Sequence, residues 1–433
     1  MSSSDVRLSA SMRAALAQDA RLALPHHGHG EPAAMQARYE AEHRWWNEGG
    51  PQVAWRADTL PTRHGPVPVR VYSPLRDARI AGCGSLSPVG CGALSPTGRR
   101  ALSPTELGTT TQLPAGATRP IIVYLHGGSY CVGSPATHDR LTRELAAATG
   151  AAVVSVDYTL APGARYPRIS EECEDVVIEL ARRFPNCPIV LVGDSCGATL
   201  SLGTWWRLKR LTGEGVAHAD ASETAARKRV AARISALVLY YGEYGLPATA
   251  ATAAATAACE SLGKPACNTD TTSDIDTADG GDTADGMSPA DRAYYDSLYF
   301  SSPTERATAP DTALLRTELR GCPPVFLAVG ECDPLLADSQ ALVTHLEVSG
   351  VRVRLEVIPG VMHAFLQRVR LLPEAARVIA DTTVFLADVL GHLGSSDSGG
   401  TSASGDASGL FGSSHFGTSS ASGRLGARAR SGR

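Results

Sequence analysis

A serine in a glycine-flanked turn is the residue of this chain best placed for nucleophilic chemistry. Ser195 is the centre of the pentapeptide Gly-Asp-Ser-Cys-Gly at 193–197, which follows the apolar run 188–192 and opens a stretch with helical character. A nucleophile held on a sharp strand-to-helix turn projects from the end of a buried sheet. The flanking glycines avoid the clash that a Cβ atom would cause in so tight a turn. We therefore predict a nucleophile at Ser195, with a plain turn as the alternative.

Two further residues lie where the partners of such a serine would be needed. A serine hydroxyl requires a base that accepts its proton and an acid that orients the base. Asp333 follows the apolar run 324–329, and His363 follows the next expected strand. Nucleophile, acid and base come in this order along chains that carry a strand–turn–helix elbow. The expected triad is therefore Ser195, Asp333 and His363. Asp338 is a rival acid, and Asp333 could instead cap the helix that follows it.

A pair of glycines after another apolar run is suited to stabilising negative charge. His126, Gly127 and Gly128 follow the run 120–125. Attack on a carbonyl carbon builds charge on its oxygen, and main-chain N–H groups aimed at that oxygen lower the barrier by about 3 kcal/mol each. The expected donors are the N–H groups of Gly127, Gly128 and Cys196, while His126 is expected to hold the loop by hydrogen bonds. A simple Gly-Gly turn is the alternative.

These residues need a sheet whose strand ends meet at one edge, and the hydrophobic pattern predicts one. Buried strands are expected at 120–125, 152–156, 188–192, 234–241 and 324–329, and half-exposed strands at 67–71 and 351–357. The prolines in and next to the strand at 67–71 predict an edge or terminal position. Helices are expected at about 137–149, 169–184, 195–211, 335–349 and 374–392. This alternation predicts an α/β fold with a mainly parallel sheet covered on both faces, whose sites form at the carboxyl ends of the strands.

Three segments of biased composition interrupt this pattern. The segments 77–118 and 248–286 are interpreted as flexible insertions, and 394–433 as a disordered Gly/Ser-rich tail. The remaining length suits one large α/β domain. We expect N-terminal cap helices within 1–50 and a catalytic domain over 51–393.

Several stretches together resemble the hormone-sensitive-lipase-like branch of the α/β-hydrolase esterases. They are 44–47, 126–133, 137–140, 156–162, 193–198, 241–246, 333–339 and 359–366. The resemblance implies an α/β-hydrolase fold with an eight-stranded, mostly parallel sheet. It also implies a helical cap made from the N-terminal helices and the segment after 245. The triad named above and an oxyanion motif at 126–128 are implied as well, with short-chain acyl esters, acetyl esters in particular, as substrates.

Two positions depart from the family pattern. Ser129 stands where the family has a third glycine, and Cys196 stands where it has alanine. A small cysteine should be tolerated because the donor there is a main-chain N–H, whereas Ser129 affects the backbone geometry of the loop. Tyr130, Trp45 and Trp46 are expected near an acyl pocket if the cap packs over the elbow. The alternative is that these aromatic residues belong to the core.

Composition limits the other classes of function. The 433 residues carry 40 Lys and Arg against 44 Asp and Glu, a net charge of −4, so no nucleic-acid partner is expected. No apolar run approaches the roughly 20 residues of a spanning helix, so no membrane partner is expected either. No dinucleotide or phosphate fingerprint is present, so no cofactor is expected, and the histidines within 26–29 are interpreted as a solvated loop rather than a metal site. The ten cysteines include no CxxC pair, which favours free thiols and a cytoplasmic location.

Three hypotheses of function follow from the sequence. The first is a serine carboxylic-ester hydrolase that forms an acyl-enzyme with a small-molecule ester, as a monomer or homodimer. The second is a non-catalytic small-molecule receptor on the same fold, although the presence of His363 argues against it. The third is a deacetylase that uses the same triad on amides or aryl acetates.

Overall fold

Eight strands within the described residues form one sheet, and its order brings the expected strand ends together. The computed structural model describes residues 8–24, 30–74, 119–210, 221–246 and 289–396. The strands are β1 (Ala54–Thr62), β2 (Gly65–Ser73), β3 (Ile121–Leu125), β4 (Ala152–Val156), β5 (Ile189–Asp194), β6 (Ile234–Tyr240), β7 (Val325–Gly330) and β8 (Val353–Ile358). Their order is β1-β2-β4-β3-β5-β6-β7-β8, and every neighbouring pair from β4 to β8 is parallel. This confirms the expected mostly parallel sheet of eight strands.

The first two strands form an antiparallel hairpin that differs from the sequence prediction. Most residues of β1 are exposed, so the strand lacks the apolar pattern that would predict it. β2 is expected at an edge, but this expectation is wrong, because β2 lies between β1 and β4. The register partners of Pro66 and Pro68 lie in β1, ahead of the stretch Val69–Tyr72 that pairs with β4, and Pro68 contributes only its carbonyl oxygen on the β4 side, to Asp157. The missing N–H groups of the two prolines therefore leave the ladder to β4 intact.

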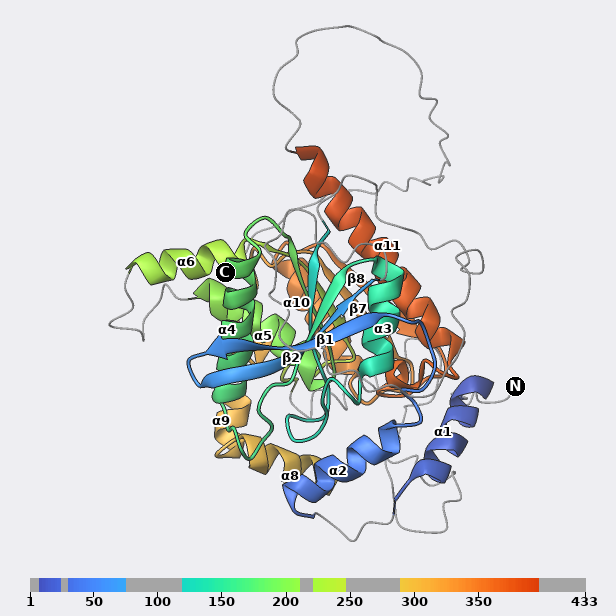
Figure 1. The fold of residues 1–433 in the computed structure, drawn as a ribbon. Helices are drawn as coiled ribbons and strands as arrows, with labels where there is room; N and C mark the ends of the chain where they lie inside the picture. The colour runs from blue at the N-terminus through green and yellow to red at the C-terminus, as the bar shows by residue number, and fades with distance from the viewer. Residues whose placement is uncertain (1–7, 25–29, 75–118, 211–220, 247–288, 397–433) are drawn as a thin grey trace, which may run out of the picture.

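Helices cover both faces of the sheet, as the alternation of elements predicts (Figure 1). One face carries α3 (Asp139–Thr149) and α11 (Pro373–Ser396), and the other carries α4 (Arg168–Arg183), α5 (Cys196–Arg210) and α10 (Leu336–Val348). Successive residues of β3 alternate between the apolar clusters under these helices. Val123 lies in the cluster that includes α5, Tyr124 lies in the cluster that includes α11, and both are fully buried. Burial on both faces explains why the central strands are apolar throughout.

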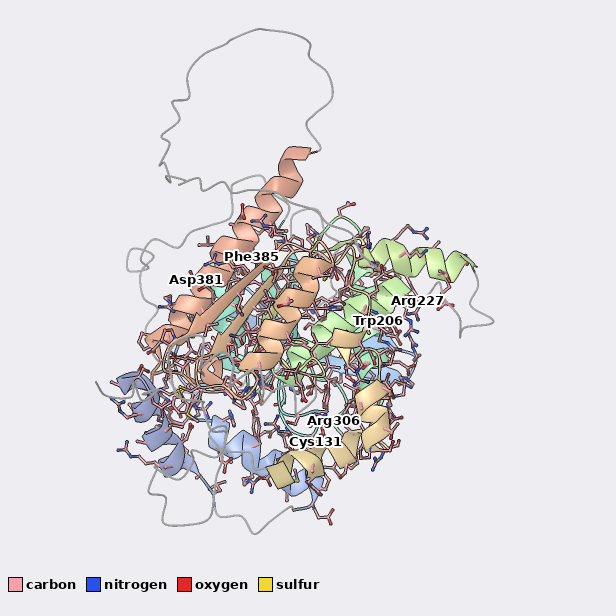
Figure 2. The ribbon with its side chains drawn as sticks, turned by 180° about the vertical axis from the view of Figure 1, so that it is seen from behind. Cys131, Trp206, Arg227, Arg306, Asp381 and Phe385 are labelled. Atoms are coloured by element: carbon pink, nitrogen blue, oxygen red, sulfur yellow. The ribbon has the colours of Figure 1, made fainter. Side chains whose placement is uncertain are left out.

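Four further helices lie together at one end of the sheet (Figure 1). They are α1 (Ala10–Leu22), α2 (Pro32–His43), α8 (Pro289–Tyr299) and α9 (Pro303–Thr308). Cys131 of the loop after β3 and Arg306 of α9 both lie beside α8 (Figure 2). The Cys131 thiol is 3.6 Å from the carbonyl oxygen of Tyr295 in α8, and Arg306 of α9 pairs with Asp296 of α8 at 2.6 Å. These helices occupy the place expected for the cap, while the domain boundaries stay a prediction.

The remaining described elements are the helix α6 (Ala221–Ala231) and the short 3-10 helices η1 (Leu314–Arg316) and η2 (Phe365–Arg368). The expected insertions 77–118 and 248–286 and the histidines within 26–29 lie outside the described residues. The tail expected from 394 begins too early, because α11 continues to Ser396, and the rest of that tail lies outside the described residues. Among helices in the described ranges, none combines the length and the apolar character needed to cross a bilayer.

The cysteines follow the sequence expectation only in part. In the described ranges, free thiols are found at Cys131, Cys173, Cys196, Cys322 and Cys332. The expectation of a free thiol is wrong for Cys187, which is disulfide-bonded. Sequence spacing reveals short-range pairs such as CxxC, but it does not reveal which distant cysteines the fold brings together.

Candidate active site

His363 of the expected triad lies within hydrogen-bonding distance of both Ser195 and Asp333. Ser195 follows β5, Asp333 follows β7 and His363 follows β8, so the carboxyl ends of three parallel strands supply them. The Nε2 atom of His363 is 3.1 Å from the Oγ atom of Ser195. The Nδ1 atom of His363 is 3.1 Å and 3.0 Å from the two carboxylate oxygens of Asp333. This geometry allows His363 to accept the serine proton while Asp333 holds the ring in the required tautomer.

The turn that carries Ser195 is strained in the way the two flanking glycines predict. Ser195 has a positive φ of 52°, a conformation that costs a non-glycine residue roughly 1 kcal/mol or more. A Cβ atom at Gly193 would overlap the carbonyl oxygen of Gly197, and one at Gly197 would overlap the carbonyl oxygen of Leu125. The main-chain N–H of Ser195 donates to the carbonyl oxygen of Tyr240 at 2.9 Å. The serine is therefore fixed between β3, β6 and the start of α5.

The rival acid Asp338 lies in a different environment. Its Oδ1 atom accepts the main-chain N–H groups of Tyr244 at 2.8 Å and Leu246 at 3.2 Å, so it holds the loop after β6. Burial raises the pKa of Asp338 to about 6, although these two hydrogen bonds act to lower it. Asp333 also accepts the N–H of Leu335 at 2.8 Å. The helix-start contact considered as an alternative for Asp333 thus coexists with its contact to the histidine.

One of the three expected oxyanion donors is already engaged. The N–H of Gly127 donates to the Oδ1 atom of Asp194 at 2.9 Å, which removes it from the set of available donors. Within the described part of the chain, the N–H groups of Gly128 and Cys196 have no hydrogen-bond partner. Gly128 needs to be glycine, because its φ is 121° and a Cβ atom there would overlap the carbonyl oxygen of Val132. The arrangement leaves Gly128 and Cys196 as the donors that a substrate oxygen can meet.

His126 stabilises the loop rather than facing the serine, as expected. Its imidazole is fully buried, and its Nδ1 atom is 2.8 Å from the carbonyl oxygen of Gly127. The hydroxyl of Tyr158 donates to the carbonyl oxygen of His126 at 2.7 Å, and the two rings stack at 4.2 Å. Burial lowers the pKa of His126 to about 3, and His138 nearby adds to this effect. His126 is therefore neutral at physiological pH and donates through Nδ1–H.

Asp194, the residue before the nucleophile, is a structural anchor that the motif spacing does not reveal. Its side chain is fully buried and accepts the hydroxyl of Tyr124 at 2.6 Å in addition to the N–H of Gly127. His138 and Gln367 approach its second oxygen at 3.4 Å and 3.3 Å. Burial alone would raise the pKa of Asp194, but the attraction of His138 and these hydrogen bonds lower it below its ordinary value. His138 lies within a stretch that carries the family resemblance and Gln367 directly follows another, which is the only sequence signal for these two residues.

The three aromatic residues expected near an acyl pocket lie in different places. Tyr130 is next to the elbow, because its main-chain N–H donates to the Sγ atom of Cys196 at 3.3 Å, and its ring stacks on Tyr299 of α8 at 4.1 Å. Trp46 is 3% exposed, and its indole N–H donates to Asp19 in α1. The pocket prediction is wrong for Trp46, which is a core residue that joins α1 to the body. The guanidinium of Arg370 lies 3.7 Å from the ring centre of Trp45.

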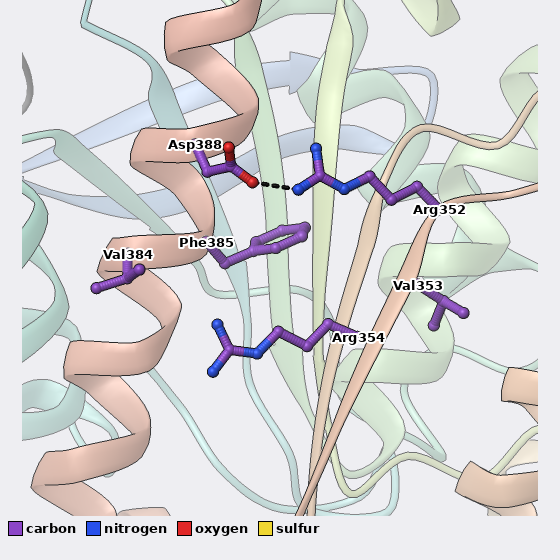
Figure 3. A pocket seen from close by; sticks show the side chains of 6 residues that line it. All are labelled: Arg352, Val353, Arg354, Val384, Phe385 and Asp388. Atoms are coloured by element: carbon purple, nitrogen blue, oxygen red, sulfur yellow. Dashed lines mark hydrogen bonds and ion pairs between the residues drawn. The ribbon is translucent and has the colours of Figure 1, made fainter. Parts of the chain in front are cut away.

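A separate pocket lies between the edge strand β8 and α11 (Figure 3). It is lined by Arg352, Val353, Arg354, Val384, Phe385 and Asp388, and an ion pair joins Arg352 to Asp388. None of the expected site residues lines this pocket. No group of His, Cys, Asp and Glu side chains suited to a metal ion occurs in the ranges that the structure describes.

Comparison with known proteins identifies the family of this fold. A family model described as the alpha/beta hydrolase fold matches residues 122–367, more than half of the chain. The chain belongs to the α/β-hydrolase family. The match confirms the fold expected from the resemblance to hormone-sensitive-lipase-like members of this family. The matched range contains the expected triad and the loop after β3.

Solved structures similar to this α/β-hydrolase include several esterases. An esterase from the archaeon Pyrobaculum calidifontis is 22% identical with a TM-score of 0.61, covering 88% of this chain and 98% of its own. One of two fungal esterases from Rhizomucor miehei is 21% identical with a TM-score of 0.60, covering 90% and 99%. An esterase of the bacterial hormone-sensitive lipase family is 20% identical with a TM-score of 0.59, covering 88% and 99%. At these identities the likeness shows the shared fold.

Proposed function

We propose that this α/β-hydrolase is a serine carboxylic-ester hydrolase that acts on short-chain acyl esters through an acyl-enzyme. The observation that carries the proposal is the continuous contact from Asp333 through His363 to the hydroxyl of Ser195, with distances of 3.0 Å and 3.1 Å. A nucleophile, a base and an orienting acid in this geometry are what acyl transfer requires. The esterase neighbours add support from the same fold.

The first half of the reaction forms the acyl-enzyme. Ser195 Oγ attacks the ester carbonyl carbon while His363 Nε2 accepts the hydroxyl proton. The carbonyl oxygen becomes negative, and the N–H groups of Gly128 and Cys196 donate to it. When the intermediate collapses, the C–O bond to the alcohol breaks and His363 returns the proton to the departing oxygen. Asp333 stabilises the imidazolium that exists between these two transfers.

The second half repeats the same steps with water. His363 takes a proton from a water molecule, whose oxygen attacks the acyl carbon bound to Ser195. The same N–H groups stabilise the second tetrahedral intermediate. Its collapse releases the carboxylic acid, and His363 returns the proton to Ser195 Oγ. Atoms and protons balance, and no added oxidant or reductant is needed.

Aromatic side chains beside the triad favour a small acyl group. The ring of Tyr241 meets the ring of His363 edge-on at 5.0 Å. The N–H of Tyr130 donates to Cys196 in the elbow, and Tyr299 and Phe300 of the cap segment pack against the ring of Tyr130. Rigid rings near the elbow favour a short acyl chain at the reacting carbon. We infer acetyl and similarly short acyl esters as the substrate class.

A panel of substrates tests both parts of the proposal. Rates with p-nitrophenyl acetate, butyrate and octanoate and with an acetanilide are measured for the wild type and for Ser195→Ala. The expected result is a decline in kcat/KM with acyl length, little amide cleavage, and loss of nearly all activity in the variant. Octanoate as the best ester would contradict the short-chain class. Faster cleavage of the acetanilide would favour the amide-directed alternative, and an inactive wild type would favour the receptor.

A further inference from the structure

Gln367 bridges the cap helix α2 and the turn that carries the nucleophile. It lies in η2, four residues after His363, and only 8% of it is exposed. Its side-chain oxygen faces two residues of α2, and its side-chain nitrogen faces Asp194 and His138. An amide carries both acceptor and donor groups, so a single side chain can connect two elements in this way.

The α2 side of the bridge is made by Tyr39 and His43. The hydroxyl of Tyr39 donates to Oε1 of Gln367 at 3.2 Å, and Nε2 of His43 is 2.8 Å from the same oxygen. Nδ1 of His43 is also 2.8 Å from the carbonyl oxygen of Tyr39. Burial lowers the pKa of His43 to about 4, so the neutral ring can donate to only one of these oxygens. Tyr39 therefore supplies a hydrogen bond to Gln367 for either tautomer of His43.

The other side of the bridge meets the anchor of the elbow. Nε2 of Gln367 is 3.3 Å from Oδ2 of Asp194 and 2.8 Å from Nε2 of His138. The amide of Gln367 can donate to Oδ2 of Asp194 whichever protonation state His138 has. Nδ1 of His138 is 2.9 Å from Oγ1 of Thr137 and 3.3 Å from the carbonyl oxygen of Ser134, which hold that ring in place. The side-chain nitrogen of Gln367 is thus held against Asp194.

Asp194 contacts both Gln367 and the loop that carries the proposed oxyanion donor Gly128. It precedes Ser195 in the chain, and its other oxygen accepts the N–H of Gly127, next to the donor Gly128. We propose that Gln367 is a positioning residue that couples docking of the cap helix α2 to the alignment of the Gly128 donor and Ser195. Gln367 acts through Asp194 and does not touch the substrate. The inference rests on the proposed ester hydrolysis and specifies how the cap influences it.

The first test removes the bridge while keeping the shape of the side chain. Gln367→Met retains a similar length but neither accepts from Tyr39 nor donates to Asp194. With p-nitrophenyl acetate we expect kcat to fall about tenfold to a hundredfold, as small misplacements of catalytic groups do, with KM nearly unchanged. Gln340→Met on α10 is the matched control and should leave both constants as in the wild type. An unchanged kcat in folded Gln367→Met would overturn the proposal.

The second test asks whether the contact between Gln367 and α2 is what affects kcat. Tyr39→Phe removes only the hydroxyl that donates to Gln367, so a modest loss in kcat of about threefold to tenfold is expected. In the Gln367→Met background the same change should have no further effect, because the bridge is already absent. Gln36 of α2 instead pairs with both main-chain groups of Gly133, at 3.1 Å and 2.8 Å. Gln36→Met should therefore act additively with Gln367→Met.

If the effects of Tyr39→Phe and Gln367→Met on kcat are additive, the two side chains act independently. That result would overturn the proposed coupling between α2 and the elbow. Tyr39→Phe is mild enough to fold, so it keeps the test decisive even if Gln367→Met does not fold. Its kcat should then fall in an otherwise wild-type chain, and an unchanged kcat overturns the proposal. Ser195→Ala is measured in the same assay. If the wild type shows no hydrolysis that depends on Ser195, the proposed function fails and the inference fails with it. If the wild type does show such hydrolysis, the comparison of Tyr39→Phe, Gln367→Met and the double variant tests the coupling alone.

Discussion

At the scale of single residues, the chemistry depends on which buried groups are charged and which are already paired. Asp333 and Asp338 lie five positions apart, yet one faces the imidazole of His363 and the other faces two main-chain N–H groups. The distinction cannot be drawn from residue type. It follows from where β7 ends and where α10 begins.

Asparagine substitutions separate the two acids by activity. Asp333→Asn should lower kcat by about ten-thousandfold, because the amide favours the wrong tautomer of His363. Asp338→Asn should keep nearly the wild-type kcat, since the amide oxygen can still accept from Tyr244 and Leu246. Hydrolysis of p-nitrophenyl acetate measures both. The reverse ranking would show that Asp338 orients the base.

Asp338 also predicts how stability changes with pH. Its folded pKa of about 6 is above the ordinary 3.8, so the folded state binds this proton more tightly than the unfolded state. The stabilisation from this proton is full below about pH 4 and is lost as the pH rises to about 6. The free energy of unfolding of the wild type should therefore fall, relative to that of Asp338→Asn, by on the order of 2 kcal/mol between pH 4 and 7. Urea unfolding at several pH values measures this difference. A difference that does not change with pH would contradict this assignment.

The site residues differ in how far the sequence could locate them. Ser195, Asp333 and His363 are marked by a turn motif and by the order of strand ends, so pattern and spacing suffice to choose them. Gly127 shows the limit, because its N–H belongs to Asp194, and only the three-dimensional contact reveals this. Gln367 likewise acquires its place from contacts to residues more than 170 positions away in the chain.

At the scale of elements, the central strands were predictable and the hairpin at the sheet edge was not. β3 to β7 are buried on both faces, so their apolar runs stand out in the sequence. β1 is mostly exposed and held by pairing to β2, and such pairing leaves little trace in hydrophobicity. The prolines of β2 misled the prediction because they lie outside its pairing with β4.

The elbow itself offers a test at this scale. Gly193→Ala places a methyl group against the main chain of Gly197, where no flexible side chain can give way. We expect a loss of at least about 2 kcal/mol in the free energy of unfolding, together with most of the activity. Gly391→Ala in α11 is the control, since a Cβ atom there meets nothing, and it should stabilise by about 0.5–1 kcal/mol. Thermal melts of both variants give the comparison, and a fully active, stable Gly193→Ala would contradict the tight-turn account.

At the scale of the whole molecule, the segment between α2 and β1 is held against α3 by contacts to Arg140 and Arg143, and Arg143 binds three of its carbonyl oxygens. The guanidinium of Arg143 in α3 donates to the carbonyl oxygens of Asn47, Gly49 and Pro51 at 2.7–2.8 Å, and to Asp139 at 2.8 Å. This segment follows the helix that contacts Gln367. Because Arg143 holds the segment that directly follows α2, it also helps to hold α2 against Gln367.

Removing this anchor should loosen the N-terminal helices. Arg143→Met leaves several carbonyl oxygens without their donor, and we expect a loss on the order of 3 kcal/mol in the free energy of unfolding. Arg320→Met is the control, because that arginine is 81% exposed and its pair with Glu318 contributes little. Urea unfolding measures both, and equal stabilities of the two variants would contradict the anchoring role.

The most direct test of the central claim is covalent labelling of Ser195. A fluorophosphonate probe is incubated with the wild type, Ser195→Ala and the control Ser235→Ala, and the labelled peptide is identified by mass spectrometry. The account predicts one label, on Ser195, in the wild type and in Ser235→Ala, and none in Ser195→Ala. A label on a different residue, or equal labelling of Ser195→Ala, would contradict the assignment of this serine as a nucleophile activated by His363.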